Sequence, residues 1–235
     1  MNPRPMKKTD ADKPWARRKD RKNAHREERQ YILVASEDGK SSVCYFEALN
    51  DMLKSHSATV GVIPKGTGRS TQSLIDFVKK HRGKWLKEVQ EDIDIDDFNE
   101  IWVAFDRDDF PKHKFDNAIN SAVANGFHAA WSNECFELWY LLHFTDRVTA
   151  ISRKDIYDEL TNKLELKKNY TAFKGKEGKV LVHEKMAGDS NVVWAIKRAR
   201  KLYNAYLAAK IPPHKSNPCT KVFELVEKLL RQIEH

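Results

Sequence analysis

With 235 residues, of which 40% are hydrophobic and 32% charged, the chain is long enough to bury a full core as one large domain or one domain with an appendage. It has no run near the ~18 apolar residues of a membrane span, and its charged start lacks the apolar segment of a secretion signal, so the composition favours a cytoplasmic protein. Cys44, Cys135 and Cys219 lie far apart; they lack the paired spacing of a zinc site and are expected to be buried free thiols.

Most of the net charge of +8 lies in residues 1–29, where 11 Lys and Arg face 5 Asp and Glu. This segment nearly lacks aliphatic residues, so we predict a disordered basic arm. Two interpretations are open: the arm contacts a phosphate backbone or a partner protein, or it is a solvated tail.

The apolar run at residues 30–36 predicts a first buried strand. A turn with Glu37 and Gly39 follows, and then a helix from about 42 to 54 with Ser41 or Ser42 as its N-cap. A strand, a tight turn and a helix are the opening of a βαβ unit, which places Glu37 just past the carboxyl end of the strand.

A second strand is predicted at residues 58–63, followed by a glycine-rich basic turn and an amphipathic helix that extends to about residue 89. The turn contains Lys65 and Arg69 and precedes a helix N-terminus, so it could hold a phosphate. The favoured alternative is an ordinary turn that uses glycine for its backbone angles.

The third strand, residues 101–105, ends in carboxylates at Asp106, Asp108 and Asp109. Ligands of parallel sheets bind at the carboxyl ends of the strands, and residues two apart in an extended chain point the same way. Like charges side by side repel unless a cation lies between them, which favours a Mg²⁺ or Mn²⁺ site. A solvated acidic loop is the alternative.

A helix from about 115 to 125 and a short strand at 127–131 precede a strongly apolar helix that opens at residue 132 and extends to Phe144. Asn133 and Glu137 are four apart, so we expect them to share a face near the start of this helix. His143 lies on another face and is expected to be a satisfied, partly buried histidine.

The composition changes after residue 148. A charged helix is predicted up to 168, followed by a basic loop containing Lys174, Lys176 and Lys179. Helices at 190–209 and 217–233 complete the chain, the last with Pro218 at its first helical position. We therefore divide the chain into the arm, a core at 30–148 and a helical extension at 149–235 that packs on the core.

The predicted elements follow the order strand, Glu with Gly, helix, strand, long helix, strand, Asp-x-Asp, and three local sequences stand out, at 36–46, 105–110 and 132–144. This order of elements resembles that of the Toprim domain of topoisomerases, primases and certain nucleases. With residues 217–220, the three sequences resemble the RloB-like family of Toprim proteins, associated with bacterial abortive phage resistance, over nearly the whole ordered chain. Two positions depart from the family pattern: Asp38 is one residue extra before Gly39, and Glu134 replaces a usual Pro.

The resemblance implies an α/β, Toprim-like Rossmannoid with a central, mainly parallel four-stranded sheet flanked by helices and a C-terminal helical extension. It also implies roles for the acidic residues: Glu37 as general acid/base or metal ligand, Asp106 and Asp108 as ligands of Mg²⁺ (or Mn²⁺), and Asp109 as an outer ligand. Asn133 and Glu137 would complete or orient the site. The lysines and the arginine of the two basic loops are the candidates for nucleic-acid binding: Lys65, Arg69, Lys174, Lys176 and Lys179.

The leading hypothesis is a metal-dependent nuclease in anti-phage defence that works with an ATPase partner bearing an ATP-binding cassette-like domain and without a membrane. Assembly as a homo-oligomer is left open. The alternative from another class is a non-catalytic nucleic-acid-binding or regulatory subunit with the same fold. A haloacid-dehalogenase-type phosphatase is disfavoured because the Asp-x-Asp motif of that family closes the first strand, whereas here it closes the third. An Asp-x-Asp glycosyltransferase would leave Glu37 without a role.

Overall fold

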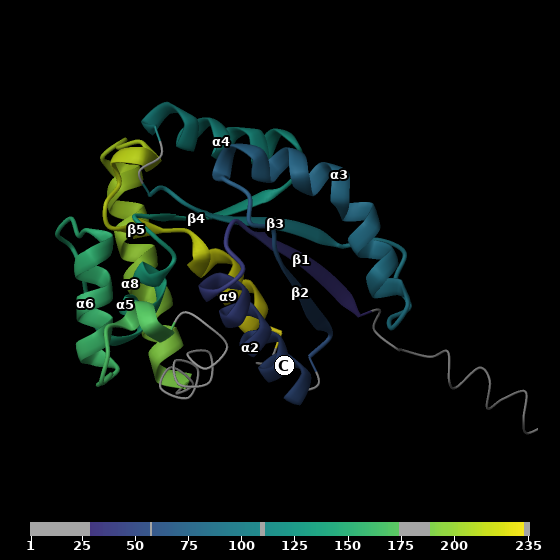
Figure 1. Ribbon diagram of the computed structural model, residues 1–235, viewed down its shortest axis with the longest axis horizontal. Coiled ribbons are helices and arrows are strands. Elements are labelled where there is room, and N and C mark those ends of the chain that lie inside the picture. Colours follow the sequence, from purple (N-terminus) through teal and green to yellow (C-terminus); the bar gives the residue numbers. More distant parts are fainter. Residues whose placement is uncertain (1–28, 57, 109–110, 174–188, 233–235) are drawn as a thin grey trace, which may run out of the picture.

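The computed structural model describes residues 29–56, 58–108, 111–173 and 189–232. A five-stranded sheet in the order β2-β1-β3-β4-β5 runs through its centre (Figure 1). Strands β1 to β4 are parallel, and β5 is antiparallel to β4. The strands are β1 (Gln30–Ser36), β2 (Val60–Gly66), β3 (Glu100–Asp106), β4 (His128–Asn133) and β5 (Cys219–Thr220). The mainly parallel α/β sheet is confirmed, whereas the predicted number of four strands is wrong by the two-residue β5.

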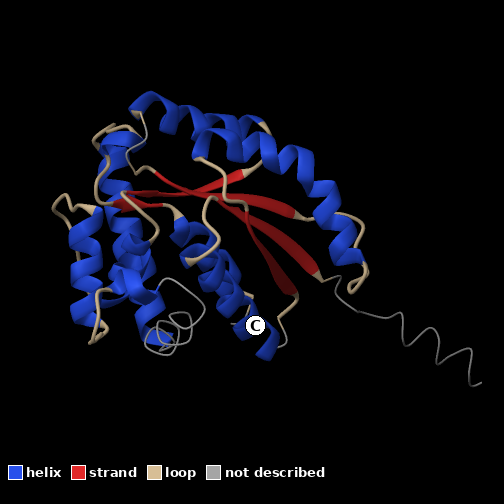
Figure 2. Cartoon of the chain, in the orientation of Figure 1, coloured by secondary structure: helices blue, strands red, loops and turns tan. Residues whose placement is uncertain are grey.

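Helices cover both faces of the sheet (Figure 2). Helices α3 and α4 lie on one face, and α2 and α9 lie on the other, beside a group formed by α5, α6 and α8 (Figure 1). The helices are α2 (Ser41–Ser55), α3 (Thr71–Gln90), α4 (Lys112–Ala124), α5 (Glu137–Phe144), α6 (Arg153–Lys163), α8 (Asp189–Ala208) and α9 (Val222–Leu230), with short 3₁₀ turns η2 (Tyr170–Phe173) and η3 (Pro213–Lys215). Among the described helices, none is long and apolar enough to span a membrane.

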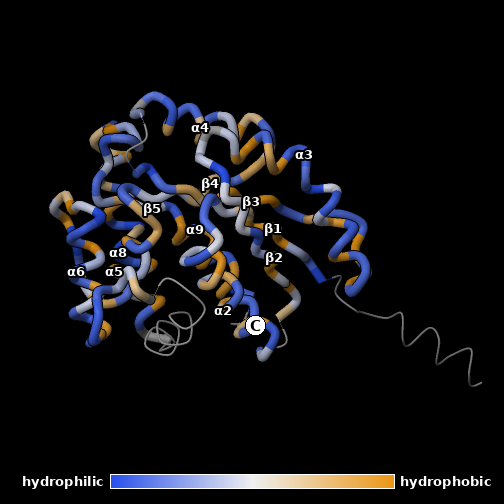
Figure 3. Tube along the Cα trace, viewed as in Figure 1, coloured by the Kyte–Doolittle hydropathy of each residue, from blue (hydrophilic) through white to orange (hydrophobic). Residues whose placement is uncertain are grey.

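The continuous apolar runs of the central strands arise because both of their faces are buried. Alternate residues of β1 supply two separate cores: Ile32 and Val34 pack on the side of α2 and α9, and Leu33 and Ala35 pack on the side of α3 and α4. The hydropathy colouring shows hydrophobic stretches along the central strands (Figure 3). Two covered faces leave the ends of the strands as the open part of the sheet, where a site can form.

The C-terminal segment differs from its predicted form. Residues 217–221 are not helical, and α9 begins at Val222 rather than at Asn217. The reason is pairing with β4: the backbone N–H of Lys221 donates to the Trp131 carbonyl (2.8 Å), and the Thr220 and Ser132 hydroxyls lie 2.9 Å apart. Tertiary hydrogen bonds at the sheet edge therefore override the local helix-start pattern.

Helix α5 is buried on nearly all sides, which explains its uniformly apolar sequence. It packs against α6 and α8, and the guanidinium of Arg198 on α8 donates to the carbonyls of Leu142 (2.8 Å) and His143 (3.1 Å) at its C-terminal end. The segment after residue 148 thus covers a helix of the preceding segment and contributes β5 to the sheet.

Candidate acidic site at the carboxyl edge of the sheet

Glu37 and Asp106 meet where the parallel strands β1 and β3 end. The Glu37 backbone N–H donates to the Ala104 carbonyl (2.9 Å), which continues the strand pairing past Ser36. The buried hydroxyl of Thr71, the first residue of α3, donates to Glu37 Oε2 (2.7 Å) and lies 3.3 Å from the Asp106 carbonyl oxygen. Thr71 therefore fixes the Glu37 carboxylate beside the end of β3.

Two glycines let the turns that carry these residues touch. A Cβ added to Gly66, at the end of β2, would lie 2.5 Å from the Gly39 Cα and 3.0 Å from the Asp38 carbonyl oxygen. No side chain fits in that space, so the turn after β1 and the turn after β2 are in backbone contact. This contact brings Asp38 and the start of α3 to the same edge of the sheet.

Asp38 supplies the acceptor at the start of α2. Its carboxylate accepts from the Ser41 backbone N–H (3.1 Å) and from the Ser42 hydroxyl (2.5 Å). The prediction that Ser41 or Ser42 is the N-cap is therefore wrong, since both lie inside the helix. A carboxylate at a helix N-terminus is favoured by the unpaired N–H groups and the helix dipole.

Glu137 reaches the same region from α5. It is only 3% exposed, and its Oε1 accepts from the Ser41 hydroxyl at 2.7 Å. The Tyr140 hydroxyl, one turn further along α5, donates to the Ser41 carbonyl at 2.7 Å. These bonds lock the start of α2 to α5 and hold a buried carboxylate behind the strand ends.

The carboxylates repel one another, and the effect is greatest at Asp106. Burial is the main cause that raises the pKa of Asp106 well above its ordinary value, and the charges of Glu137, Asp38 and Glu37 add to it, against a backbone hydrogen bond from Phe136. Burial also raises the pKa of Glu37, while the hydrogen bond from the Thr71 hydroxyl lowers it. Asp106 is therefore the group at which a cation would relieve the most repulsion.

The extended geometry from which Asp108 was expected to point the same way as Asp106 does not continue to Asp108. The strand ends at Asp106, and Asp108 has a left-handed backbone (φ 41°), which removes the two-residue periodicity of extended chain. Its carboxylate forms an ion pair with Arg153 on α6. Asp109 lies outside the described residues.

Asp106 and Asp108 still line one pocket, of about 390 Å³, which we call the acidic pocket. Its walls come from the ends of β1 and β3, the turn before α3 and the segment before α5. It is lined by Glu37, Asp38, Ser42, Gly68, Arg69, Ser70, Ala104, Phe105, Asp106, Asp108 and Phe136.

Asn133 is not on the helix with Glu137, and that prediction is wrong. Pairing with Cys219 extends β4 through Asn133, and α5 begins only at Glu137. The Asn133 side chain is buried, with Nδ2 donating to the Pro213 carbonyl (3.0 Å), and Oδ1 has no hydrogen-bond partner among the described residues.

His143, predicted as a satisfied histidine, has its Nδ1 2.9 Å from the Trp139 carbonyl oxygen and is buried. The satisfied histidine is confirmed. This hydrogen bond holds the His143 ring away from the site.

The two basic loops differ in what the structure describes. Arg69 lines the acidic pocket, and its guanidinium lies over the Phe77 ring, 4.8 Å from the centroid. Lys65 is instead the penultimate residue of β2 and forms an ion pair with Glu88 at 2.8 Å. The three loop lysines lie outside the described residues: Lys174, Lys176 and Lys179.

Two features of the pocket fit a hard divalent cation. Its donors are carboxylate oxygens, the ligands that Mg²⁺ and Mn²⁺ prefer, and the charges of Glu137, Asp38 and Glu37 add to burial in raising the pKa of Asp106. In the described part of the chain, no three His, Cys, Asp or Glu side chains form a group that could hold a metal ion in this conformation.

Sequence reasoning missed three residues of this region: Asp38, Thr71 and Arg153. The spacing from Asp38 to Ser41 is a helix-start signal that would have found the first. Thr71 and Arg153 act across long sequence separations and leave no local signal.

The fold and the site define an α/β protein with an acidic pocket at the carboxyl edge of a mainly parallel sheet. A family model described as RloB-like protein matches residues 32–229, which is most of the chain. The chain therefore belongs to the RloB-like family. No curated protein and no solved structure matches it.

Proposed function

We propose that this protein is a metal-dependent nuclease that hydrolyses phosphodiester bonds of DNA or RNA in the acidic pocket. The observation that carries the proposal is the crowding of Asp106 by the charges of Glu37, Asp38 and Glu137, with Arg69 on the wall of the same pocket. A metal ion bound there would polarise the phosphate and activate a water molecule.

The residues of the chain divide the remaining work. Asp106 is the principal metal-binding carboxylate, and Asp108 adds a ligand once Arg153 releases it. The raised pKa of Glu37 suits a group that takes a proton from water or gives one to the leaving oxygen. Thr71 orients that carboxylate. Arg69, which lines the pocket, binds the phosphate.

The wider role is also proposed. The order of parallel strands, with Glu after the first and Asp at the end of the third, agrees with a Toprim-like fold. Resemblance to the RloB-like family supports a cytoplasmic role in anti-phage defence or abortive infection, together with an ATPase that bears an ATP-binding cassette-like domain. That role requires no membrane, and assembly as a homo-oligomer would be compatible with it.

The test is cleavage of labelled single- and double-stranded DNA and RNA by the full chain with Mg²⁺ or Mn²⁺. Glu37→Gln and Asp106→Asn should each lower the rate by about 100-fold or more, because each removes a group that acts in the transition state. Asp76→Asn, an exposed carboxylate on α3, is the matched control and should cut at the wild-type rate. Cleavage that persists in both site variants would overturn the proposal.

One observation favours a second candidate, a non-catalytic nucleic-acid-binding or regulatory subunit. The ion pair of Asp108 with Arg153 engages one of the expected metal ligands. This candidate predicts that oligonucleotides bind without being cut, with and without the ATPase. Metal-dependent cutting that needs Asp106 would exclude it.

A further inference from the structure

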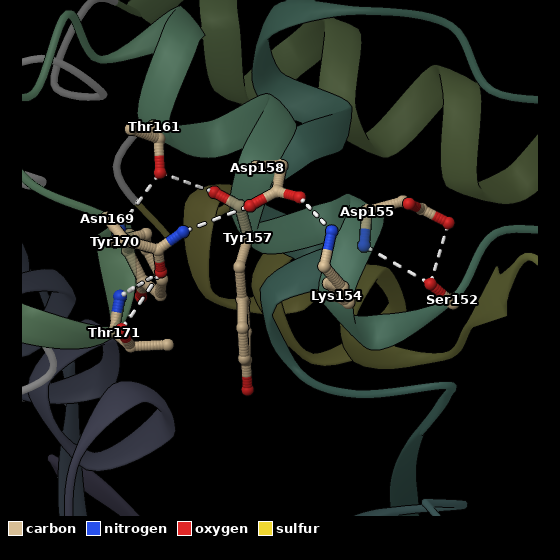
Figure 4. Close-up of polar contacts among 9 residues, drawn as sticks. All are labelled: Ser152, Lys154, Asp155, Tyr157, Asp158, Thr161, Asn169, Tyr170 and Thr171. Carbon is tan, nitrogen blue, oxygen red and sulfur yellow. Dashed lines mark hydrogen bonds and ion pairs between the residues drawn. The ribbon is translucent and has the colours of Figure 1, made fainter.

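A second pocket, of about 480 Å³, lies beside α6 and the turn that leads into η2. We call it the α6 pocket. Its walls include Ser152, Arg153, Lys154 and Tyr157 from the start of α6, and Asn169 and Thr171 from η2 and the residue before it. Figure 4 shows Ser152 and Lys154 on one side of Tyr157 and Asn169 and Thr171 on the other, with the Tyr157 ring pointing away from Thr161.

Arg153 joins the α6 pocket to the acidic pocket. Its guanidinium pairs with Asp108, which lines the acidic pocket, while Arg153 itself lines the α6 pocket. A ligand that occupies both pockets would therefore pass beside the Arg153–Asp108 ion pair.

The polar groups of the α6 pocket are held in place by one another. Asn169 Oδ1 accepts from the backbone N–H (3.1 Å) and the hydroxyl (2.9 Å) of Thr171. Asn169 Nδ2 donates to Asp158 Oδ1 (3.0 Å), and Lys154 Nζ donates to Asp158 Oδ2 (2.8 Å) (Figure 4). Asn169 therefore has one amide hydrogen left to donate, and the Thr171 hydroxyl oxygen has capacity to accept.

This combination of groups matches a nucleoside. Tyr157 is a half-buried aromatic ring of the kind on which bases stack. Asn169 and Thr171, both exposed, supply a fixed donor and an acceptor of the kind that read a base edge. Arg153 supplies a planar cation suited to a phosphate between the two pockets.

We propose that the α6 pocket binds the nucleoside next to the phosphate held in the acidic pocket, so that the substrate strand enters unpaired. Arg153 exchanges Asp108 for the phosphate that links this nucleoside to the next. A base inside a duplex cannot reach the pocket, because its edge and faces are covered by pairing and stacking. This inference rests on the proposed function for the phosphate in the acidic pocket.

The test measures binding, by fluorescence anisotropy, of the full chain to labelled homopolymers of about 12 nucleotides. DNA and RNA, single strands and duplexes, are compared in Ca²⁺. Asn169→Ala and Thr171→Val should each weaken single-strand binding about tenfold and alter the preference among bases, while duplex binding is unchanged. Asn162→Ala, the same substitution at an exposed site on α6 that does not line the pocket, should stay within about twofold of wild type. Thermal melting checks that each variant is folded; Thr171→Val keeps the side-chain shape if Asn169→Ala does not fold.

Three results would overturn the inference: no binding of single strands by the wild type, no effect of a folded variant, or an equal loss for single strands and duplexes. A free mononucleotide that competes as well as the strand would also overturn it.

The two proposals fail separately. Cleavage that needs Asp106 but is indifferent to Asn169 would refute only the α6 pocket, and binding that needs Asn169 without any cleavage would refute only the nuclease.

Discussion

Asp106 occupies a position where ionisation is unfavourable, mainly because it is buried and also because other carboxylates surround it. In the unfolded chain the same group ionises freely near its ordinary pKa of about 3.9. Above that pH the folded state holds more protons than the unfolded state, so stability falls as the pH rises. The site therefore lowers the stability of the fold, as functional sites commonly do.

Asp106→Asn removes this repulsion and should raise the free energy of unfolding by about 0.5–2 kcal/mol at pH 7 to 8. The gain should shrink as the pH falls and disappear below about pH 4, where the carboxyl group is protonated in both states. Denaturant melts over this pH range, with Asp76→Asn as the exposed control, measure it. A variant less stable than wild type at pH 8 would contradict the electrostatic account.

His143 has the opposite pH dependence. Burial lowers its pKa to about 4, whereas the unfolded side chain titrates near 6.5. Between these values the unfolded state binds a proton that the folded state excludes, so stability is lost as the pH falls from about 6.5 to 4, on the order of 3 kcal/mol in all.

His143→Asn keeps a donor for the Trp139 carbonyl and removes the titration, so the loss of stability in this pH window should become much smaller. His113→Asn, at an exposed position on α4, should leave the pH profile of the melting temperature unchanged. The same acid slope in wild type and His143→Asn would show that other groups cause it.

At the level of single residues, the sequence placed Glu37 and Asp106 because both follow apolar strand runs, and strand ends are a local signal. It misplaced Asn133, since the length of β4 depends on pairing with Cys219, far along the chain. The two-residue periodicity expected for Asp106 and Asp108 does not apply, because the extended geometry stops at the end of the strand.

Among the secondary-structure elements, the contact between the two turns is the tightest constraint on the site. Gly66→Ala should destabilise the protein by about 2 kcal/mol, because its Cβ would meet the backbone of Gly39 and Asp38. It should also displace Asp38 and Glu37 and slow the cleavage that we propose.

Gly83→Ala is the matched control, because Gly83 lies inside α3 and nothing lies within 4 Å of an added Cβ. It should stabilise the protein by about 0.5–1 kcal/mol through its better helix propensity. Thermal or urea melts measure the stability of the two variants. An equal change in stability for Gly66→Ala and Gly83→Ala would show that the turn contact is not a constraint.

The four long strands and most helices could be predicted because periodicity and apolar runs are local properties. The two-residue β5 could not, since so short a strand has no hydrophobic pattern and exists only through pairing with β4. The same pairing explains why α9 begins later than its proline suggested.

For the molecule as a whole, the segments before and after residue 148 share one core. Helix α5 belongs to the first segment, yet its buried Leu138, Trp139 and Leu142 lie in one cluster with apolar residues of α6, α8 and α9. Residues 30–148 alone should therefore expose this surface, aggregate or bind a hydrophobic dye, and melt without cooperativity. The chain from 29 to 235 is the control. A monomeric fragment 30–148 with a cooperative melt would show that the first segment folds by itself.

Binding of a divalent cation by Asp106 in the acidic pocket, as we propose, can be measured by calorimetric titration of the full chain with Mn²⁺. We predict that wild type and Asp76→Asn bind Mn²⁺ and gain thermal stability with its concentration. Asp106→Asn should lose both the binding heat and the gain in stability. Equal Mn²⁺ binding by wild type and Asp106→Asn, or no binding by wild type, would contradict the account.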